Sequence, residues 1–209
     1  MVLLGLFGGL ALLLYGMQLC GEGLQRAAGG HLRHLLTSMT RNRLAAVYTS
    51  PLERARRTAE IAVEGLGLSV TQVHELRELS LGDWEGQTVE EISSLPGDPY
   101  TQWVRDPVAC LPPGAEPLAD VQLRVVGAMA DIAAAHPDGQ EALVVCHGGV
   151  ISAYLAYCLG LPLSSIWRLT LSNGSISEIA PPIVRSVNST RHLAGLAAGG
   201  PLAPSRLGH

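Results

Sequence analysis

The chain has 209 residues, which suits one or two domains, and its formal net charge is -4. Its 14 cationic side chains are all arginines, because the sequence contains no lysine. The missing amine excludes a Walker-type phosphate loop, a pyridoxal Schiff base and a lysine general base, and the small negative charge predicts no nucleic-acid partner.

The first 21 residues form an apolar segment with no charged side chain. Its length is sufficient for a helix that crosses a bilayer. Four arginines follow it, at Arg26, Arg33, Arg41 and Arg43, and would leave the rest of the chain in the cytoplasm. We therefore expect a cytoplasmic protein with membrane contact through residues 1–21, and the competing interpretation is a buried apolar helix.

Strand and helix patterns begin after this segment. Residues 44–49 are a short β-prone run. Ser50, Pro51 and Glu53 then have the spacing of a helix N-cap, a first-turn proline and a capping box, so the sequence predicts a helix from Ser50 to about Gly65. Residues 88–91 repeat the capping-box spacing.

The second half of the chain continues the alternation. Residues 118–135 place apolar side chains on one helical stripe, and Arg124 lies off that stripe. Residues 142–146 are a continuous apolar strand, which His147 and two glycines separate from a helix that ends near Leu159. Alternation of this kind predicts an α/β fold with a mostly parallel sheet.

Ligands bind such sheets just past the carboxyl ends of the strands. Arg54 lies in the first turn after one strand, and His147 and Gly148 follow another, where glycine lets a ligand approach the backbone. Glu78 lies between these two segments, and a carboxyl near an anion site is a candidate proton donor. Taken singly, each of the three charged or titratable residues is more often a solvated or structural group.

Several segments together resemble the histidine phosphatase superfamily, which includes phosphoglycerate mutases and α-ribazole phosphatases. The similar segments, in order, are residues 47–59, 76–86, 144–149, 171–175 and 188–193. The resemblance implies a phosphoglycerate mutase-like, three-layer αβα sandwich that hydrolyses a small phosphomonoester without cofactor or metal. It also implies that Arg54 binds the phosphate, His147 contacts the transferring phosphoryl group beside Gly148, and Glu78 protonates the leaving oxygen.

One part of the family pattern is missing from the 209 residues. Members of the family open with a strand that ends in Arg-His-Gly, whose histidine attacks phosphorus, and this sequence contains no such triplet. The usual spacing would place it near residues 4–6. We therefore expect the first strand to be missing or replaced by an apolar helix.

The segment in its place resembles another family. Residues 10–44 are similar to the start of a bacterial sodium/phosphate cotransporter. We therefore predict a segment of different origin over residues 1–43, a phosphatase-like domain over 44–193 and a disordered tail over 194–209.

The sequence predicts a phosphatase crippled by loss of its nucleophile. Cys146 is no replacement, because a thiol in an apolar strand is kept inert by a raised pKa. The alternative is a non-catalytic phosphate-ester binder or an inactive fusion, tethered to a membrane by its first residues. No feature of the sequence indicates an oligomeric state.

Overall fold

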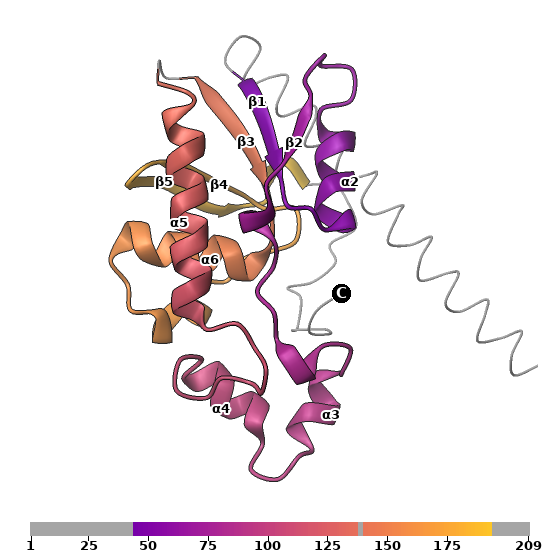
Figure 1. Ribbon diagram of the computed structural model, residues 1–209, viewed down its shortest axis with the longest axis vertical. Helices are drawn as coiled ribbons and strands as arrows, with labels where there is room; N and C mark the ends of the chain where they lie inside the picture. Colours follow the sequence, from indigo (N-terminus) through magenta and orange to yellow (C-terminus); the bar gives the residue numbers. More distant parts are fainter. Residues whose placement is uncertain (1–43, 138–139, 194–209) are drawn as a thin grey trace, which may run out of the picture.

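The computed structural model describes residues 44–137 and 140–193 (Figure 1). Its centre is a three-stranded parallel sheet in the order β2-β1-β3. The strands are β1 (Leu44–Thr49), β2 (Val70–Gln72) and β3 (Glu141–Val145). The prediction for β1 is confirmed, and β3 begins and ends one residue earlier than expected.

Helices cover both faces of this sheet. They are α2 (Glu53–Ala62), α5 (Leu118–Ala134) and α6 (Gly148–Leu159). Successive strand residues point to opposite faces, so Val47 packs against Ala59 and Ala62 of α2, whereas Tyr48 packs in a cluster with Ile132 of α5. The predicted three-layer αβα sandwich is therefore confirmed.

The predicted apolar stripe of α5 forms its buried face. Val121 and Val125 pack against Val150 and Ala153 of α6. Because α6 has few polar residues, it can be buried between α5 and the rest of the sandwich. This packing sets the N-terminus of α6, which begins at the end of β3, directly at the edge of the sheet.

A small lobe, residues 82–111, lies at one end of the sandwich and carries α3 (Val89–Ser93) and α4 (Pro99–Arg105) (Figure 1). Its core joins Trp84, Trp103 and Ile92, with the two indole rings edge-to-face at 5.8 Å. The Trp103 ring also contacts Trp167, 4.9 Å away. The second capping box is confirmed, since the Thr88 side chain and Glu91 cap α3 reciprocally.

The two connections of the lobe pass close to each other at Gly82. This residue has a φ of 56°, and a Cβ atom there would lie 2.2 Å from the Pro113 carbonyl oxygen. Only glycine permits both the backbone conformation and the approach. The lobe is therefore fastened at its base by backbone contact.

An antiparallel hairpin follows the sandwich in the chain. It consists of β4 (Ile176–Ala180) and β5 (Ile183–Ser189), which the described residues pair only with each other. The remaining described elements are short 3₁₀ helices: η1 (His74–Leu76), η2 (Gly82–Trp84), η3 (Leu163–Arg168) and η4 (Arg191–Leu193). The sheet is thus mostly parallel, as expected.

The start of α2 differs from the prediction. The helix begins at Glu53, its cap residue is Leu52 without a side-chain bond, and it ends at Ala62 instead of about Gly65. The Ser50 amide instead donates to the Val145 carbonyl oxygen at 3.0 Å, which extends the β1–β3 pairing by one residue. Ser50 therefore continues the pairing just past the end of β1, and the prediction that it caps the helix was wrong.

Several predictions lie outside the described residues. They concern the replaced first strand, the separate segment 1–43, membrane contact through residues 1–21 and the tail 194–209. Within residues 44–137 and 140–193, no helix combines the length and the apolar character that crossing a membrane requires.

Candidate active site

The carboxyl ends of β1 and β3 bring Ser50 and His147 together. Because the two strands are parallel and adjacent, the residues that follow them meet at the same edge. The Ser50 hydroxyl lies 2.7 Å from Nε2 of His147, and both side chains are buried. Ser50 also accepts a hydrogen bond from the Leu52 amide at 3.2 Å. The orientation of the His147 ring is therefore fixed by a serine that is itself held in place.

The His147 ring is neutral near pH 7. Burial, together with the positive charges of Arg54 and Arg124, lowers the pKa of His147 to about 4. An anion bound beside the ring would favour its protonated form, because opposite charge raises the pKa of a base. His147 can therefore act as a hydrogen-bond partner for an anion and gain charge when that anion arrives.

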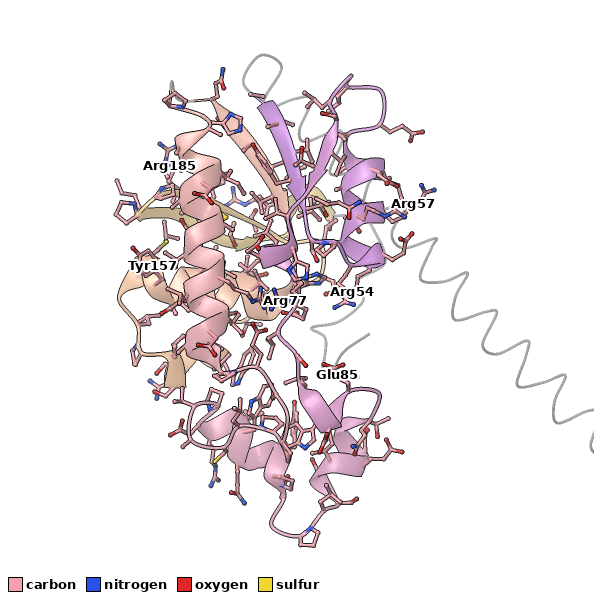
Figure 2. The ribbon with its side chains drawn as sticks, viewed as in Figure 1. Arg54, Arg57, Arg77, Glu85, Tyr157 and Arg185 are labelled. Carbon is pink, nitrogen blue, oxygen red and sulfur yellow. The ribbon has the colours of Figure 1, made fainter. Side chains whose placement is uncertain are left out.

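Arg54 supplies a permanent cation to the same edge. It lies in the first turn of α2, half-buried, and its charge interacts with both Glu78 and His147. Burial lowers the pKa of the Arg54 guanidinium, and the Glu78 carboxyl opposes that change. Figure 2 shows Arg54 and Arg77 at the end of the sandwich that faces the lobe. A guanidinium at a helix N-terminus is a suitable binding group for an anion.

The Glu78 carboxyl lies at the N-terminus of α6. One carboxyl oxygen accepts the Leu79 amide at 3.1 Å, and the N–H groups of Gly149 and Val150 also face it. Burial raises the pKa of Glu78, and these N–H groups and Arg54 offset only part of the rise. A carboxyl with a raised pKa keeps its proton to higher pH, which is the property that a proton donor needs.

The two glycines after His147 have different surroundings. A Cβ atom on Gly149 would lie 2.0 Å from Cδ2 of Leu79 and 2.8 Å from Oε1 of Glu78, so only glycine fits there. A Cβ atom on Gly148 would meet nothing within 4 Å. Gly149 therefore permits the approach of Glu78 to α6, and Gly148 leaves its backbone open to a ligand.

The structure thus gathers Arg54, Glu78, His147 and Gly148 at one edge of the sheet. The sequence missed Ser50, which it placed on a helix, and Arg124, which it placed off the buried stripe of α5. The strand-end position of Ser50, shared with His147, was the signal that could have identified it. No periodic signal identifies Arg124, whose side chain is only 11% exposed.

Other chemistry is less well supported at this edge. Burial raises the pKa of the Cys146 thiol to about 12, in line with the expectation that it is inert. Across the described residues, no group of three or more His, Cys, Asp and Glu side chains has the arrangement of a metal site.

Comparison with known proteins places the chain in a family. The chain matches the histidine phosphatase superfamily (branch 1) over residues 19–182. This match begins inside the segment 1–43, for which the sequence predicts a different origin. The sequence-based resemblance to the superfamily is confirmed.

Individual relatives agree with this match. The chain is 31% identical over 163 residues to phosphoserine phosphatase 1 of Hydrogenobacter thermophilus, covering 76% of this chain and 77% of that one. It is 30% identical over 150 residues to the adenosylcobalamin/alpha-ribazole phosphatase of Salmonella typhimurium, covering 72% and 74%.

A solved structure shows the same fold with phosphate. It is a mycobacterial glucosyl-3-phosphoglycerate phosphatase in complex with inorganic phosphate, with a TM-score of 0.68 and 26% identity, covering 80% of this chain and 86% of that one. All three relatives are named as phosphatases, and the solved one shares the α/β fold of this chain. The chain belongs to the histidine phosphatase superfamily, branch 1.

Proposed function

We propose that the chain hydrolyses a small phosphomonoester at the edge formed by Arg54, Glu78, His147 and Gly148. The observation that carries this proposal is the convergence of a cation, a neutral imidazole and a carboxyl of raised pKa at the ends of two adjacent strands. Two relatives, a phosphoserine phosphatase and an adenosylcobalamin/alpha-ribazole phosphatase, support a small phosphomonoester as the substrate class.

Each residue has a role that follows from its chemistry. Arg54 binds the phosphate oxygens and stabilises the charge on them in the transition state. His147 and the open backbone at Gly148 contact the same group. A water molecule forms a bond to phosphorus as the bond between phosphorus and the leaving oxygen breaks. Glu78 transfers its proton to that oxygen, so the product leaves as an alcohol, and a proton of the attacking water restores the Glu78 carboxyl through solvent.

We further propose that turnover is slow. The 209 residues contain no Arg-His-Gly triplet, and His147 is the imidazole that the described residues place beside Arg54. Loss of a covalent nucleophile lowers kcat by several orders of magnitude in enzymes that depend on one. The same observation favours a second candidate, a non-catalytic binder of phosphate esters.

Residues 1–43 enter this proposal as a separate N-terminal part. Their apolar first 21 residues would bring the phosphatase domain, residues 44–193, to the cytoplasmic face of a membrane, and residues 194–209 would follow as a tail. Flotation of the full chain with phospholipid vesicles tests this part. Recovery of all the protein in the vesicle-free fraction contradicts it.

Release of p-nitrophenol from p-nitrophenyl phosphate tests the catalytic proposal. We expect a slow rate that is lost in His147→Ala and reduced in Glu78→Gln. The matched control is Arg57→Ala, because Arg57 is an exposed arginine on the same helix as Arg54. We expect that control to retain the rate.

The possible results separate the candidates. A slow rate that both site variants leave unchanged contradicts the assignment of the site. A rate typical of efficient phosphatases contradicts slow turnover. No rate, together with a phosphate-dependent rise in melting temperature, favours the binder, and the absence of both contradicts both functions.

A further inference from the structure

Arg124 is a buried arginine that contacts the backbone on either side of Glu78. It lies on α5, and its side chain is 11% exposed. One terminal nitrogen donates to the carbonyl oxygens of Glu75 and Arg77, the latter at 2.8 Å. The other terminal nitrogen lies 3.5 Å from the Glu78 carbonyl oxygen. A single guanidinium therefore reaches three carbonyls within four consecutive residues.

The opposite side of this guanidinium is held by Glu116. The carboxylate accepts from Nε and Nη2 of Arg124 at 2.8 and 2.9 Å, in a bidentate pair. The carboxylate also accepts a hydrogen bond from Arg77 at 3.2 Å. The backbone amide of Glu116 donates to the Ser80 carbonyl at 3.0 Å. A planar guanidinium held on two sides has one orientation only, which lysine could not reproduce.

The pair is charged. Burial alone would raise the pKa of Glu116, but the hydrogen bonds and charge of Arg124, with the charge of Arg77, outweigh it and lower the pKa. A buried ion pair that is satisfied in this way adds specificity of position more reliably than stability. The arrangement therefore suits a role in holding a particular geometry.

The segment that carries Glu78 needs such a partner. Residues 77–81 lie outside the helices and strands. The carbonyls of Ser80 and Leu81 accept backbone amides, whereas those of Arg77 and Glu78 face the Arg124 side chain. Arg124 provides that bond to Arg77 and lies beside the carbonyl of Glu78 itself. Fixing the Glu78 backbone limits where its carboxyl can lie.

We infer that Arg124 is a positioning residue that holds the Glu78 carboxyl against the N-terminus of α6, with Glu116 orienting its guanidinium. This inference rests on the proposed function of Glu78 as the proton donor. Arg124 contacts the backbone of the segment, and the carboxyl itself is bound by the amides of Leu79, Gly149 and Val150. Arg124 therefore acts on the reaction through Glu78.

Other charged and titratable groups surround the same carboxyl. Arg54 faces it from α2, and the thiol of Cys146, the residue after β3, interacts with it. His147, at the start of α6, is influenced by the charges of Arg54 and Arg124. Since none of these groups is removed by a change at Arg124, a shift of the Glu78 titration in such a variant reports a displaced carboxyl.

The decisive experiment follows the titration of Glu78 by NMR in protein labelled with ¹³C at the glutamate carboxyl. The Glu78 signal is assigned by its absence in Glu78→Gln. In Arg124→Lys, we expect the pKa of Glu78 to fall toward its ordinary value, because a displaced carboxyl is better solvated. The control Arg57→Lys, an exposed site on α2, keeps the wild-type titration.

Glu116→Gln is the second variant and keeps Arg124 in the chain. It retains one oxygen acceptor but loses the charged pair, so we expect a smaller shift in the same direction. If Arg124→Lys does not fold, the Glu78 titration in Glu116→Gln tests the positioning role. An unchanged Glu78 titration in the folded variants overturns the inference.

Leaving-group dependence adds a kinetic readout. Phenyl phosphate needs a proton on its leaving oxygen more than p-nitrophenyl phosphate does. We expect Arg124→Lys and Glu78→Gln to lose about tenfold more rate with phenyl phosphate, and the double variant to be no slower than Glu78→Gln. Equal losses with both esters in Arg124→Lys contradict positioning.

The two failures can be told apart. If Glu78→Gln itself shows no leaving-group dependence, the proposed proton donor is wrong, whatever Arg124 does. If Glu78→Gln shows the dependence and Arg124→Lys neither shows it nor shifts the titration, only the positioning role is wrong.

Discussion

Two neighbouring stretches of this chain are held in place by different forces. Residues 75–80 carry Glu78 and are fastened by charged hydrogen bonds from Arg124, whose guanidinium is paired with the Glu116 carboxylate. The lobe, residues 82–111, is held by contact among apolar and aromatic side chains around Trp84 and Trp103. Hydrogen bonds fix direction, whereas apolar burial depends on area and little on orientation.

This difference separates position from stability. A carboxyl that must lie at one helix terminus needs directional bonds, and their net contribution to folding is small. The lobe has only to remain folded, and its buried tryptophans provide the larger free energy. Changes in the first stretch should therefore alter chemistry, and changes in the second should alter stability.

The largest expected effect is on the lobe. Trp103 is 6% exposed and contacts Trp84 and Trp167. Trp103→Ala should lower the free energy of unfolding by about 3–5 kcal/mol, because it leaves a cavity. Urea denaturation measures this loss, and Trp103→Phe should lose less. A loss in Trp103→Ala of less than about 1 kcal/mol would break the comparison.

Gly149, near the start of α6, lies against Glu78 and Leu79 of the first stretch, and the neighbouring Gly148 provides a comparison. Gly149→Ala should cost about 1–3 kcal/mol, because its methyl group would overlap Leu79 and approach Glu78. Gly148→Ala should keep the free energy of unfolding but weaken phosphate binding, since its methyl group would occupy the open space there. Denaturation and phosphate titration of both variants measure these effects. Equal losses of stability in both would contradict the different surroundings of the two positions.

The last expected effect, which appears only below about pH 6.5, is a pH dependence from His147. Its pKa is about 4 in the folded protein and ordinary, near 6.5, in the unfolded chain. Between these values the unfolded state binds more protons, so the His147 contribution is present above pH 6.5 and is lost as pH falls toward 4. The loss is on the order of 3 kcal/mol.

The difference in unfolding free energy between wild type and His147→Gln isolates this contribution. We expect it to be constant above pH 7 and to move in favour of the variant as the pH falls through the window. Glu78, whose pKa is raised, has the opposite slope and is present in both proteins. A difference that stays flat from pH 7 to pH 4 would show that the ring is not held neutral.

Periodic patterns predicted most of the fold. The strand at residues 44–49 and the stripe along α5 follow from spacings that are local in the sequence. The predicted start of α2 was less accurate. The spacing of Ser50, Pro51 and Glu53 favours a helix cap at Ser50, but the Ser50 amide pairs with the end of β3. Tertiary hydrogen bonding outweighed the local signal.

The site divides in the same way. Arg54, His147 and Gly148 follow from the rule that ligands bind past strand ends, and Glu78 from its motif. The roles of Arg124 and Glu116 could not be predicted from the sequence, because they depend on contacts between distant segments. Arg124 donates to the Arg77 carbonyl and pairs with the Glu116 carboxylate. A pattern can show that Arg124 lies off the apolar stripe, but it cannot show that another segment covers it.

Binding of inorganic phosphate is the most direct test of the central claim that Arg54 and His147 form one anion site. Isothermal titration should show binding to the wild-type chain, with affinity reduced by about tenfold or more in Arg54→Ala and in His147→Ala. Arg57→Ala should bind as the wild type does, since Arg57 lies exposed on the same helix. Equal affinity in Arg54→Ala and the wild type would contradict the account.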